Sequence, residues 1–359
     1  MAKAVNITDL QRASIEYNNV LRELPYFQFM EAAKKLRINI QKVQGEHVLI
    51  SKRRKADFLR PYKAGLTLGQ EKELLKFFES KLKPETVYAE LNDNILAYKD
   101  KKVISNAGEP VDNKSKKHPL EFLILRDLVI SVGEDVLFNM FHAQRDEDTA
   151  SAATSFNGFF HKLDLLVTAE EIAAAKGNLK TTGAFEVAAE NADTSFANYT
   201  RMVDFIKSAH PLLRRGEALL YASEAPMSFV RDDFRKMVKS FDYPSMEQVV
   251  EKLRSDANCP GLQVITDETL GTGDQLILTK PGNFDFGVGE ESDSNYVQVR
   301  NPHTDPNIVQ YWIQAAYDTR IQDVHQKLFL TNEQKNTGLN LAGDYSDPVE
   351  EEEGGDGGE

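Results

Sequence analysis

The sequence is poor in cysteine: Cys259 is the only one among 359 residues. A single thiol cannot form a disulfide within the chain, and it cannot supply the several thiolates of a zinc-finger type of site. Cys259 stands directly before Pro260, so we expect a small side chain that is buried or lies in a turn. Disulfide bridges within the chain and thiolate-zinc folds are therefore excluded as sources of stability.

Long hydrophobic runs are also missing. No window comes near the roughly 18 consecutive apolar residues of a transmembrane helix. The first residues, MAKAVNITDLQRAS, lack the basic and then apolar layout of a secretory signal. With 41% hydrophobic residues the chain can form cores in water, and its length allows two or three compact units. We expect synthesis in the cytoplasm and no membrane partner.

Positive charge is in deficit, and the formal net charge is -13. Because phosphate binding needs clustered cations, this charge argues against general affinity for nucleic acids. The one dense basic cluster is Lys52-Arg53-Arg54-Lys55. For this cluster a solvated surface, a contact with phosphates and a contact with an acidic neighbouring subunit all stay open. The acidic end, 344–359, is predicted to be a disordered tail, either solvated or docked on a basic partner.

Motifs of catalysis are missing as well. The stretch GTGD at 271–274 has neither the third glycine of a dinucleotide fingerprint nor the Gly-Lys-Ser/Thr ending of a phosphate loop. Neither H-E-x-x-H nor G-x-S-x-G occurs. The nearest approach to a metal-ligand pair is His303 with Asp305, and local spacing suggests no third ligand. We therefore expect no enzyme activity, no cofactor and no metal.

The apolar pattern predicts an α+β chain without the regular βαβ alternation of a doubly wound sheet. Helices are predicted over 7–36, where Pro25 separates two short ones, and over 67–83, 132–144, 194–213 and 245–255, with one more after the turn that follows Ala222. Strands are predicted over 47–51, 218–222, 262–266, 274–279, 284–288, 295–301 and from 308 to about Leu330. Two strand-like stretches, 87–98 and 120–130, flank a polar excursion that is predicted to be a functional arm or partly disordered.

From about Leu120 onward, the order of these features resembles the major capsid proteins of tailed bacteriophages, a shell-forming family with the architecture called the Johnson fold. EFLILRDLVISVGEDVLFNMFHAQRDEDT is similar to an arm strand that leads into the long spine helix, and SFNGFF to the turn that closes that helix. NYTRMVDFIKSAHPLLRRGEALLYASEAPMSFVRDDF is similar to a helix, buried strand and turn of the axial domain. The strands in PGLQVIT, DQLILTKPGNFDFGV, NYVQVRN and IVQYWIQAAYDTRIQDVHQKLFLT are similar to those that complete the axial domain and return to the peripheral one.

The resemblance implies a division of the chain into parts. These parts are an N-terminal arm (1–58), a linking helix (59–84), an extended loop (85–127), a first peripheral part with the spine helix (128–184), an axial domain (185–295), a second peripheral part (296–343) and the acidic tail (344–359). In this family the extended loop lies across a neighbouring subunit.

The resemblance also implies a structural protein. It would be a phage or prophage major capsid subunit that self-assembles in the host cytoplasm into hexamers and pentamers of an icosahedral shell around double-stranded DNA. A scaffolding protein and a portal would be further partners. Candidates for contacts with other subunits or with DNA are two basic clusters and two residues of the Lys-Pro-Gly-Asn turn: Lys52, Arg53, Arg54, Lys55, Lys99, Lys101, Lys102, Lys114, Lys116, Lys117, Lys280 and Asn283.

Two alternatives stay open. An encapsulin-type nanocompartment shares the architecture but encloses a cargo enzyme, so portal and terminase genes beside this one, against a peroxidase or ferritin-like gene, would separate the two kinds of shell. An enzyme whose site is assembled from distant residues would instead have a pocket with convergent titratable groups.

Overall fold

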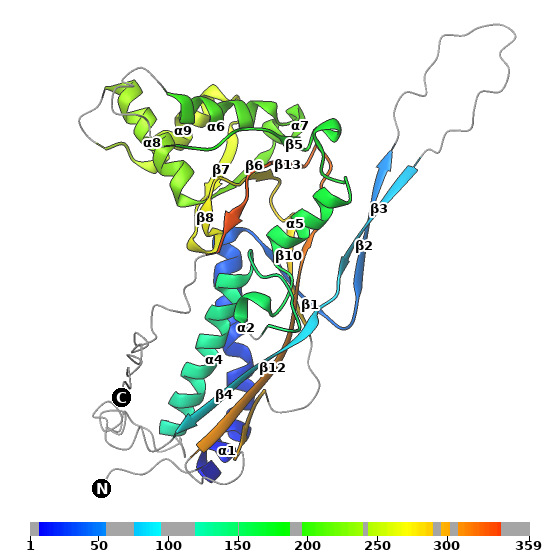
Figure 1. The fold of residues 1–359 in the computed structure, drawn as a ribbon, viewed down its shortest axis with the longest axis vertical. Coiled ribbons are helices and arrows are strands. Elements are labelled where there is room, and N and C mark those ends of the chain that lie inside the picture. The colour runs from blue at the N-terminus through cyan, green and yellow to red at the C-terminus, as the bar shows by residue number, and fades with distance from the viewer. Residues whose placement is uncertain are drawn as a thin grey trace, which may run out of the picture.

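The computed structural model describes residues 7–54, 75–94, 119–149, 151–186, 196–239, 243–289, 296–301 and 308–338. The chain forms a larger elongated unit, a smaller unit stacked at one end of it, and a two-stranded hairpin that projects from the larger unit (Figure 1). Two clusters of buried apolar side chains form the core: one lies within the smaller unit, and the other fills the larger unit and continues onto the smaller unit's sheet.

The larger unit is built on a five-stranded sheet in which β10, β11 and β4 all pair with the long strand β12, and β1 adds to β10. Its strands are β1 (Asn39–Val43), β4 (Glu85–Asn94), β10 (Phe284–Gly289), β11 (Val297–Arg300) and β12 (Ile308–Ile321). Its helices are α1 (Ile7–Glu16), α2 (Asn18–Leu36), α4 (Pro119–Asn139) and α5 (Phe159–Thr168).

The smaller unit has a second five-stranded sheet, in the order β5-β13-β9-β6-β7. Its strands are β5 (Leu179–Lys180), β6 (Glu217–Ala222), β7 (Gly261–Ile265), β9 (Leu276–Thr279) and β13 (Phe329–Asn332). Its helices are α6 (Ala197–Ser208), α7 (Pro211–Arg215), α8 (Glu224–Val238) and α9 (Met246–Asp256). Two short strands, β8 (Thr272–Gly273) and β14 (Asn336–Thr337), pair beside it. The described residues also form the single turns η2 (Ala152–Thr154), η3 (Ala174–Lys176) and η4 (Glu268–Leu270).

The two faces of the larger sheet differ in chemistry where β1, β10 and β12 lie side by side. On one face Phe286 pairs across the ladder with Thr319 and packs edge-on against Phe29 of α2, with ring centroids 5.4 Å apart. Tyr317 stacks on Phe286 at 5.7 Å. The opposite face carries Asp285 and Arg320, which are also cross-strand partners. Strand alternation therefore separates an aromatic face under the helices from a polar face.

The long helix α4 was predicted from the sequence, but its bounds were not. Helix α4 begins at Pro119, so the strand predicted over 120–130 is wrong. The helix predicted over 132–144 is confirmed over 132–139, where it is the end of this longer helix, and is wrong over 140–144. Leu125 and Val129, four residues apart, are fully buried on the side that packs against the N-terminal helices. The apolar run LEFLILRDLVIS satisfies strand and helix patterns alike, and packing at the four-residue spacing decides for helix.

The N-terminal helices are part of the larger core. Two helices form as predicted, but they meet at Tyr17, and Pro25 lies buried inside α2. Leu10, Leu21 and Phe29 are almost completely buried in the same cluster as α4. The stretch predicted to be an N-terminal arm is therefore packed against the body over α1, α2 and β1.

The helix predicted over 67–83 is wrong for its described part. Residues 75–82 form strand β3 (Leu75–Leu82), which pairs antiparallel with β2 (His47–Arg54) over eight residue pairs, while 67–74 lie outside the described residues. The apolar spacing of Leu74, Leu75, Phe78 and Leu82 suited a helix, but a partner strand 20 or more residues away offered backbone pairing that local spacing does not reveal. The ends of the predicted extended loop likewise have regular structure, since β4 is a strand of the larger sheet and 119–127 belong to α4.

Most of the remaining predictions agree with the structure. Buried strand β6, helices α6, α8 and α9, strands β7, β9, β10 and β11, and strands β12 and β13 all lie where the sequence placed them, within a few residues. One further prediction is wrong: SFNGFF does not close the long helix, since α4 ends at Asn139, and it leads instead into α5.

A buried hydrogen bond joins the two units. The Tyr221 hydroxyl on β6 donates to the Leu36 carbonyl oxygen at the end of α2, at 2.6 Å. Replacing Tyr221 by Phe leaves that buried carbonyl without this donor, so we expect Tyr221→Phe to lower the free energy of unfolding by about 1 kcal/mol. Urea unfolding followed by circular dichroism measures this loss. An unchanged midpoint would mean that the bond adds nothing.

Candidate functional site

The hairpin of β2 and β3 is the part of the chain that reaches out from the body (Figure 1). Its register runs from His47 opposite Leu82 to Arg54 opposite Leu75. Because opposed residues in an antiparallel pair share a face, alternate pairs divide the hairpin into two faces.

The inner face is attached to the polar face of the larger sheet. Leu82 is fully buried, and a β-carbon added at Gly287 would come within 2.9 Å of its side chain. The Ser80 hydroxyl donates to the carbonyl oxygen of Ile321 at 2.7 Å. The hairpin root is therefore packed on β10 and bonded to the end of β12.

The outer face carries four apolar side chains that remain exposed in the isolated chain. Their exposed fractions are 41% for Val48, 53% for Ile50, 38% for Leu75 and 54% for Phe77. Val48 and Ile50 alternate along β2, and Phe77 lies opposite Lys52 on the same face. The same face also carries Lys81 and Glu79, opposite Val48 and Ile50. We call the four exposed apolar side chains the apolar stripe, and apolar side chains gathered on one exposed face in this way mark an interaction surface.

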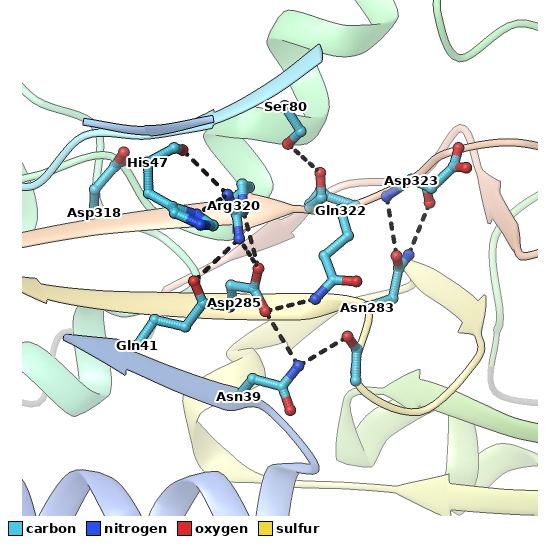
Figure 2. Close-up of polar contacts among 12 residues, drawn as sticks. Asn39, Gln41, His47, Ser80, Asn283, Asp285, Asp318, Arg320, Gln322 and Asp323 are labelled. Carbon is cyan, nitrogen blue, oxygen red and sulfur yellow. Dashed lines mark hydrogen bonds and ion pairs between the residues drawn. The ribbon is translucent and has the colours of Figure 1, made fainter. Parts of the chain in front are cut away.

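A buried ion pair lies beneath the hairpin root (Figure 2). The side chains of Arg320 and Asp285 are 1% and 0% exposed. Arg320 donates to Asp285 Oδ2 through Nε at 2.9 Å and also through Nη2. The second carboxylate oxygen of Asp285 accepts from Asn39 at 3.1 Å and from Gln322 at 2.8 Å. The carboxylate is thus completely satisfied.

The remaining N–H groups of Arg320 hold the start of the hairpin. Nη1 donates to Nδ1 of His47 at 2.9 Å and to the His47 carbonyl oxygen at 3.2 Å, and Nη2 donates to Gln41 Oε1 at 3.2 Å (Figure 2). Since a guanidinium only donates, the Nδ1 of His47 accepts and its proton sits on Nε2. Five donor bonds from one buried cation therefore connect β1, β2 and β10.

Asp318 holds the second strand of the hairpin, β3, at the root. Its Oδ2 accepts from the backbone N–H of Lys83, just after β3, at 2.9 Å, and its Oδ1 pairs with Lys162 of α5 at 2.9 Å. Burial raises the pKa of Asp318, and the Lys162 ammonium and these hydrogen bonds oppose that rise. Both strands of the hairpin thus leave the body from polar anchors on β12.

The predicted contact residues are distributed unevenly. Lys52 lies exposed on the outer face of β2, and the backbones of Arg53 and Arg54 continue that strand. Seven of the predicted lysines lie outside the described residues: Lys55, Lys99, Lys101, Lys102, Lys114, Lys116 and Lys117.

The turn at 280–283 connects the two sheets, since it follows β9 of the smaller unit and precedes β10 of the larger. Asn283 is 1% exposed and donates to Thr279 and to the Asp323 carbonyl oxygen, both at 2.9 Å. It also accepts from the Asp323 N–H at 3.0 Å. Its side chain therefore faces inward, contrary to the prediction of a subunit contact at an exposed tip, while Lys280 is half-buried beside it.

Sequence reasoning missed the two features that define this region. The apolar stripe had a signal, because Val48 and Ile50 alternate on a predicted strand beside the basic cluster. The ion pair had a weaker signal in the sequence. Asp318 and Arg320 are opposite charges two residues apart in a mostly apolar strand, and such a strand buries charge only with a partner. Asp285, 35 residues away, could not be matched to Arg320 from spacing.

Among the described residues no group of three or more His, Cys, Asp or Glu side chains could hold a metal ion. No helix there is long and apolar enough to span a bilayer. Cys259 is fully buried, as expected.

The ion pair yields a stability prediction. Arg320→Met leaves a buried carboxylate without its cation, so we expect a loss of about 3–5 kcal/mol in the free energy of unfolding. Hydrogen–deuterium exchange should also speed up at 47–51, because the root of β2 loses two bonds. Guanidinium unfolding and exchange mass spectrometry measure both effects.

Two further variants control this experiment. Arg300→Met removes an exposed guanidinium from β11 and should cost less than about 1 kcal/mol. Arg320→Met combined with Asp285→Leu removes both charges and should regain much of the lost stability. If Arg320→Met is no worse than Arg300→Met, the pair does not hold the hairpin.

The fold was compared with known proteins. No family model matches the sequence, and no curated protein matches it. A chain of the satellite phage P4 procapsid, a particle that includes the size determination (Sid) protein, superposes with a TM-score of 0.54 and 12% identity, covering 88% of this chain and 91% of that chain. A chain of the capsid of Myoviridae phage XM1 superposes with a TM-score of 0.50 and 10% identity, covering 84% and 90%.

At sequence identities this low, the similarity shows the fold alone. The superpositions extend over nearly the whole of each chain, so they include both units. The protein therefore has the α+β fold of tailed-phage capsid subunits, the Johnson fold, as its sequence predicted.

Proposed function

We propose that this protein is the major capsid protein of a tailed phage or prophage, which self-assembles into hexamers and pentamers of an icosahedral shell around double-stranded DNA. The observation that carries the proposal is a capsid fold combined with an exposed apolar stripe on a projecting hairpin. Four large apolar side chains on one face of a two-stranded ribbon cost free energy in water. Burial against a neighbouring subunit removes that cost.

We assign the larger unit to the peripheral domain, with α4 as the spine helix, and the smaller unit to the axial domain around capsomer centres. The β2–β3 hairpin takes the role of the extended loop, in place of residues 85–127. Its anchor on Arg320 and Asp318 directs the apolar stripe outward from the body.

Assembly into a shell implies which partners the protein has. Copies of the chain are the main partner, and a scaffolding protein, a portal and packaged DNA complete the proposed virion, which forms in the host cytoplasm. We propose no catalytic role. The described part of the basic cluster, 52–54, lies at the far end of β2, where it serves contacts between subunits.

Expression of the chain, alone and with its genomic neighbours, tests the proposal. We expect rings, sheets or shells in negative-stain micrographs and fast-sedimenting material in gradients. Monodisperse monomers under every condition would contradict the proposal. Shells that hold a cargo enzyme in place of DNA would point to a nanocompartment.

The stripe predicts a separate outcome. Ile50→Asp with Phe77→Asp should abolish particles and leave a soluble monomer, because two charges cannot be buried against an apolar neighbour. Circular dichroism should be unchanged, since both side chains are exposed in the monomer. The matched variant Ile50→Val with Phe77→Leu keeps the surface apolar and should still assemble. Normal particles from the Asp variant would remove the hairpin from the interface.

A further inference from the structure

The second half of helix α8 carries a row of cations. Arg231, Arg235 and Lys239 follow one another at four-residue spacing, so they share one face of the helix, and Lys236 lies beside them. We call these four residues the basic stripe. Lys239 is exposed, the other three are partly exposed, and among the described residues none of the four forms an ion pair. The helix dipole favours cations in the last turn, but the stripe begins a turn earlier.

Tyr243 holds the two arginines of the basic stripe in place. The guanidinium carbon of Arg231 lies 3.9 Å from the centroid of the Tyr243 ring, and that of Arg235 lies 5.2 Å from it. Arg231 Nε also donates to the Pro244 carbonyl oxygen at 2.8 Å. The acid on this face of the helix, Asp232, accepts the hydroxyl of Tyr243 instead of pairing with an arginine.

Two guanidiniums are therefore positioned in advance of any ligand. Their Nη groups make no hydrogen bond with the described residues. A planar guanidinium binds a carboxylate through two parallel N–H donors, more specifically than a lysine does. The surface fits an anion with several carboxylates in a row.

The sequence contains one such anion, at its C-terminal end. Residues 350–353 are four consecutive glutamates, and the last ten residues include six acids. This segment has no large apolar side chain to bury, so a surface that binds it must recognise charge.

The described chain ends close to the start of α8. Strand β14 pairs with β8, and Gly338 follows β14 directly. Strand β8 contacts α8 (Figure 1), and the hydroxyl of Ser223, the residue before α8, donates to the Gly273 carbonyl oxygen. Helix α8 has 15 residues and is therefore about 22 Å long. The chain between Gly338 and Glu350 spans up to about 40 Å when extended, so the four glutamates can reach the far end of α8.

We propose that the acidic tail, 344–359, docks on the basic stripe of its own subunit, with the glutamates of 350–353 on the guanidiniums of Arg231 and Arg235. Each exposed ion pair adds little by itself, but the tether holds the tail at an effective concentration in the millimolar range. The docked tail shields the stripe from other polyanions. The contact goes beyond the proposed function, since it forms within one subunit whether or not shells assemble.

A fluorescent peptide with the sequence of residues 344–359 tests the docking by competition. A neutral-tail chain carries four substitutions: Glu350→Gln, Glu351→Gln, Glu352→Gln and Glu353→Gln. We expect the peptide to bind this chain at least ten-fold more tightly than it binds the wild-type chain, because the wild-type tail already occupies the stripe. Fluorescence anisotropy measures both affinities, and added salt should weaken the binding.

Two further variants of the neutral-tail chain locate the binding site. Arg231→Gln with Arg235→Gln should abolish peptide binding. Lys207→Gln with Arg215→Gln, at two exposed cations on α6 and α7, makes the same change in net charge and should leave peptide binding intact. Circular dichroism checks that all variants keep the fold.

Cross-linking of the wild-type chain shows which subunit the tail occupies. A carbodiimide joins carboxylates to lysines in contact, so we expect products between 350–353 and Lys236 or Lys239. In a mixture of ¹⁴N- and ¹⁵N-labelled chains, mass spectrometry should find these products within one chain.

Three outcomes would overturn the proposal. The first is equal peptide affinity for the wild-type and neutral-tail chains. The second is a set of cross-links found only between differently labelled chains, which would mean that the tail occupies a neighbouring subunit. The third is a double-stranded oligonucleotide that needs Arg231 and Arg235 and binds both chains equally well, which would assign the stripe to nucleic acid. Particle formation enters none of these readings, so failure here leaves the shell function untouched.

Discussion

The guanidinium of Arg320, buried beneath the hairpin, is the constraint on which the rest of the larger unit depends. A buried charge is tolerated only when its hydrogen bonds are complete, and all five N–H groups of Arg320 are used. Those bonds reach three strands that are far apart in the sequence. Removing any one strand would leave the cation short of acceptors, so the sheet and the hairpin root form together.

The two faces of the larger sheet contribute differently to the structure. The aromatic face, with Phe286 and Tyr317 against Phe29, supplies apolar burial and joins the N-terminal helices to the sheet. The polar face orients the hairpin, because its hydrogen bonds fix the angle at which β2 and β3 leave the larger sheet. Asn283 performs a similar task between the units, since its side chain ties the turn after β9 to the segment after β12. Stability and orientation thus come from different side chains.

The sequence predicted the elements whose pattern is local and missed those that depend on distant partners. Buried strand β6 and helix α9, which starts at Ser245 with a capping box, have their signals within a dozen residues. Strand β3 was mistaken for a helix because its pairing partner, β2, lies beyond the range of periodicity. The same limit applies to function: the basic cluster at Lys52 could be named as a candidate, but the apolar stripe became visible only when β2 and β3 were paired.

The hairpin is a ribbon of two strands held at one end. Its root is fixed, whereas no third strand among the described residues pairs with its outer part, and two-stranded ribbons twist more readily than wider sheets. A ring of six and a ring of five differ by about 12° in the rotation from one subunit to the next. If this difference in rotation is spread over the eight residue pairs of the hairpin, the twist changes by only about one to two degrees per pair. In the shell that we propose, the ribbon would therefore give one polypeptide a mechanical way to occupy both kinds of ring with an unchanged body.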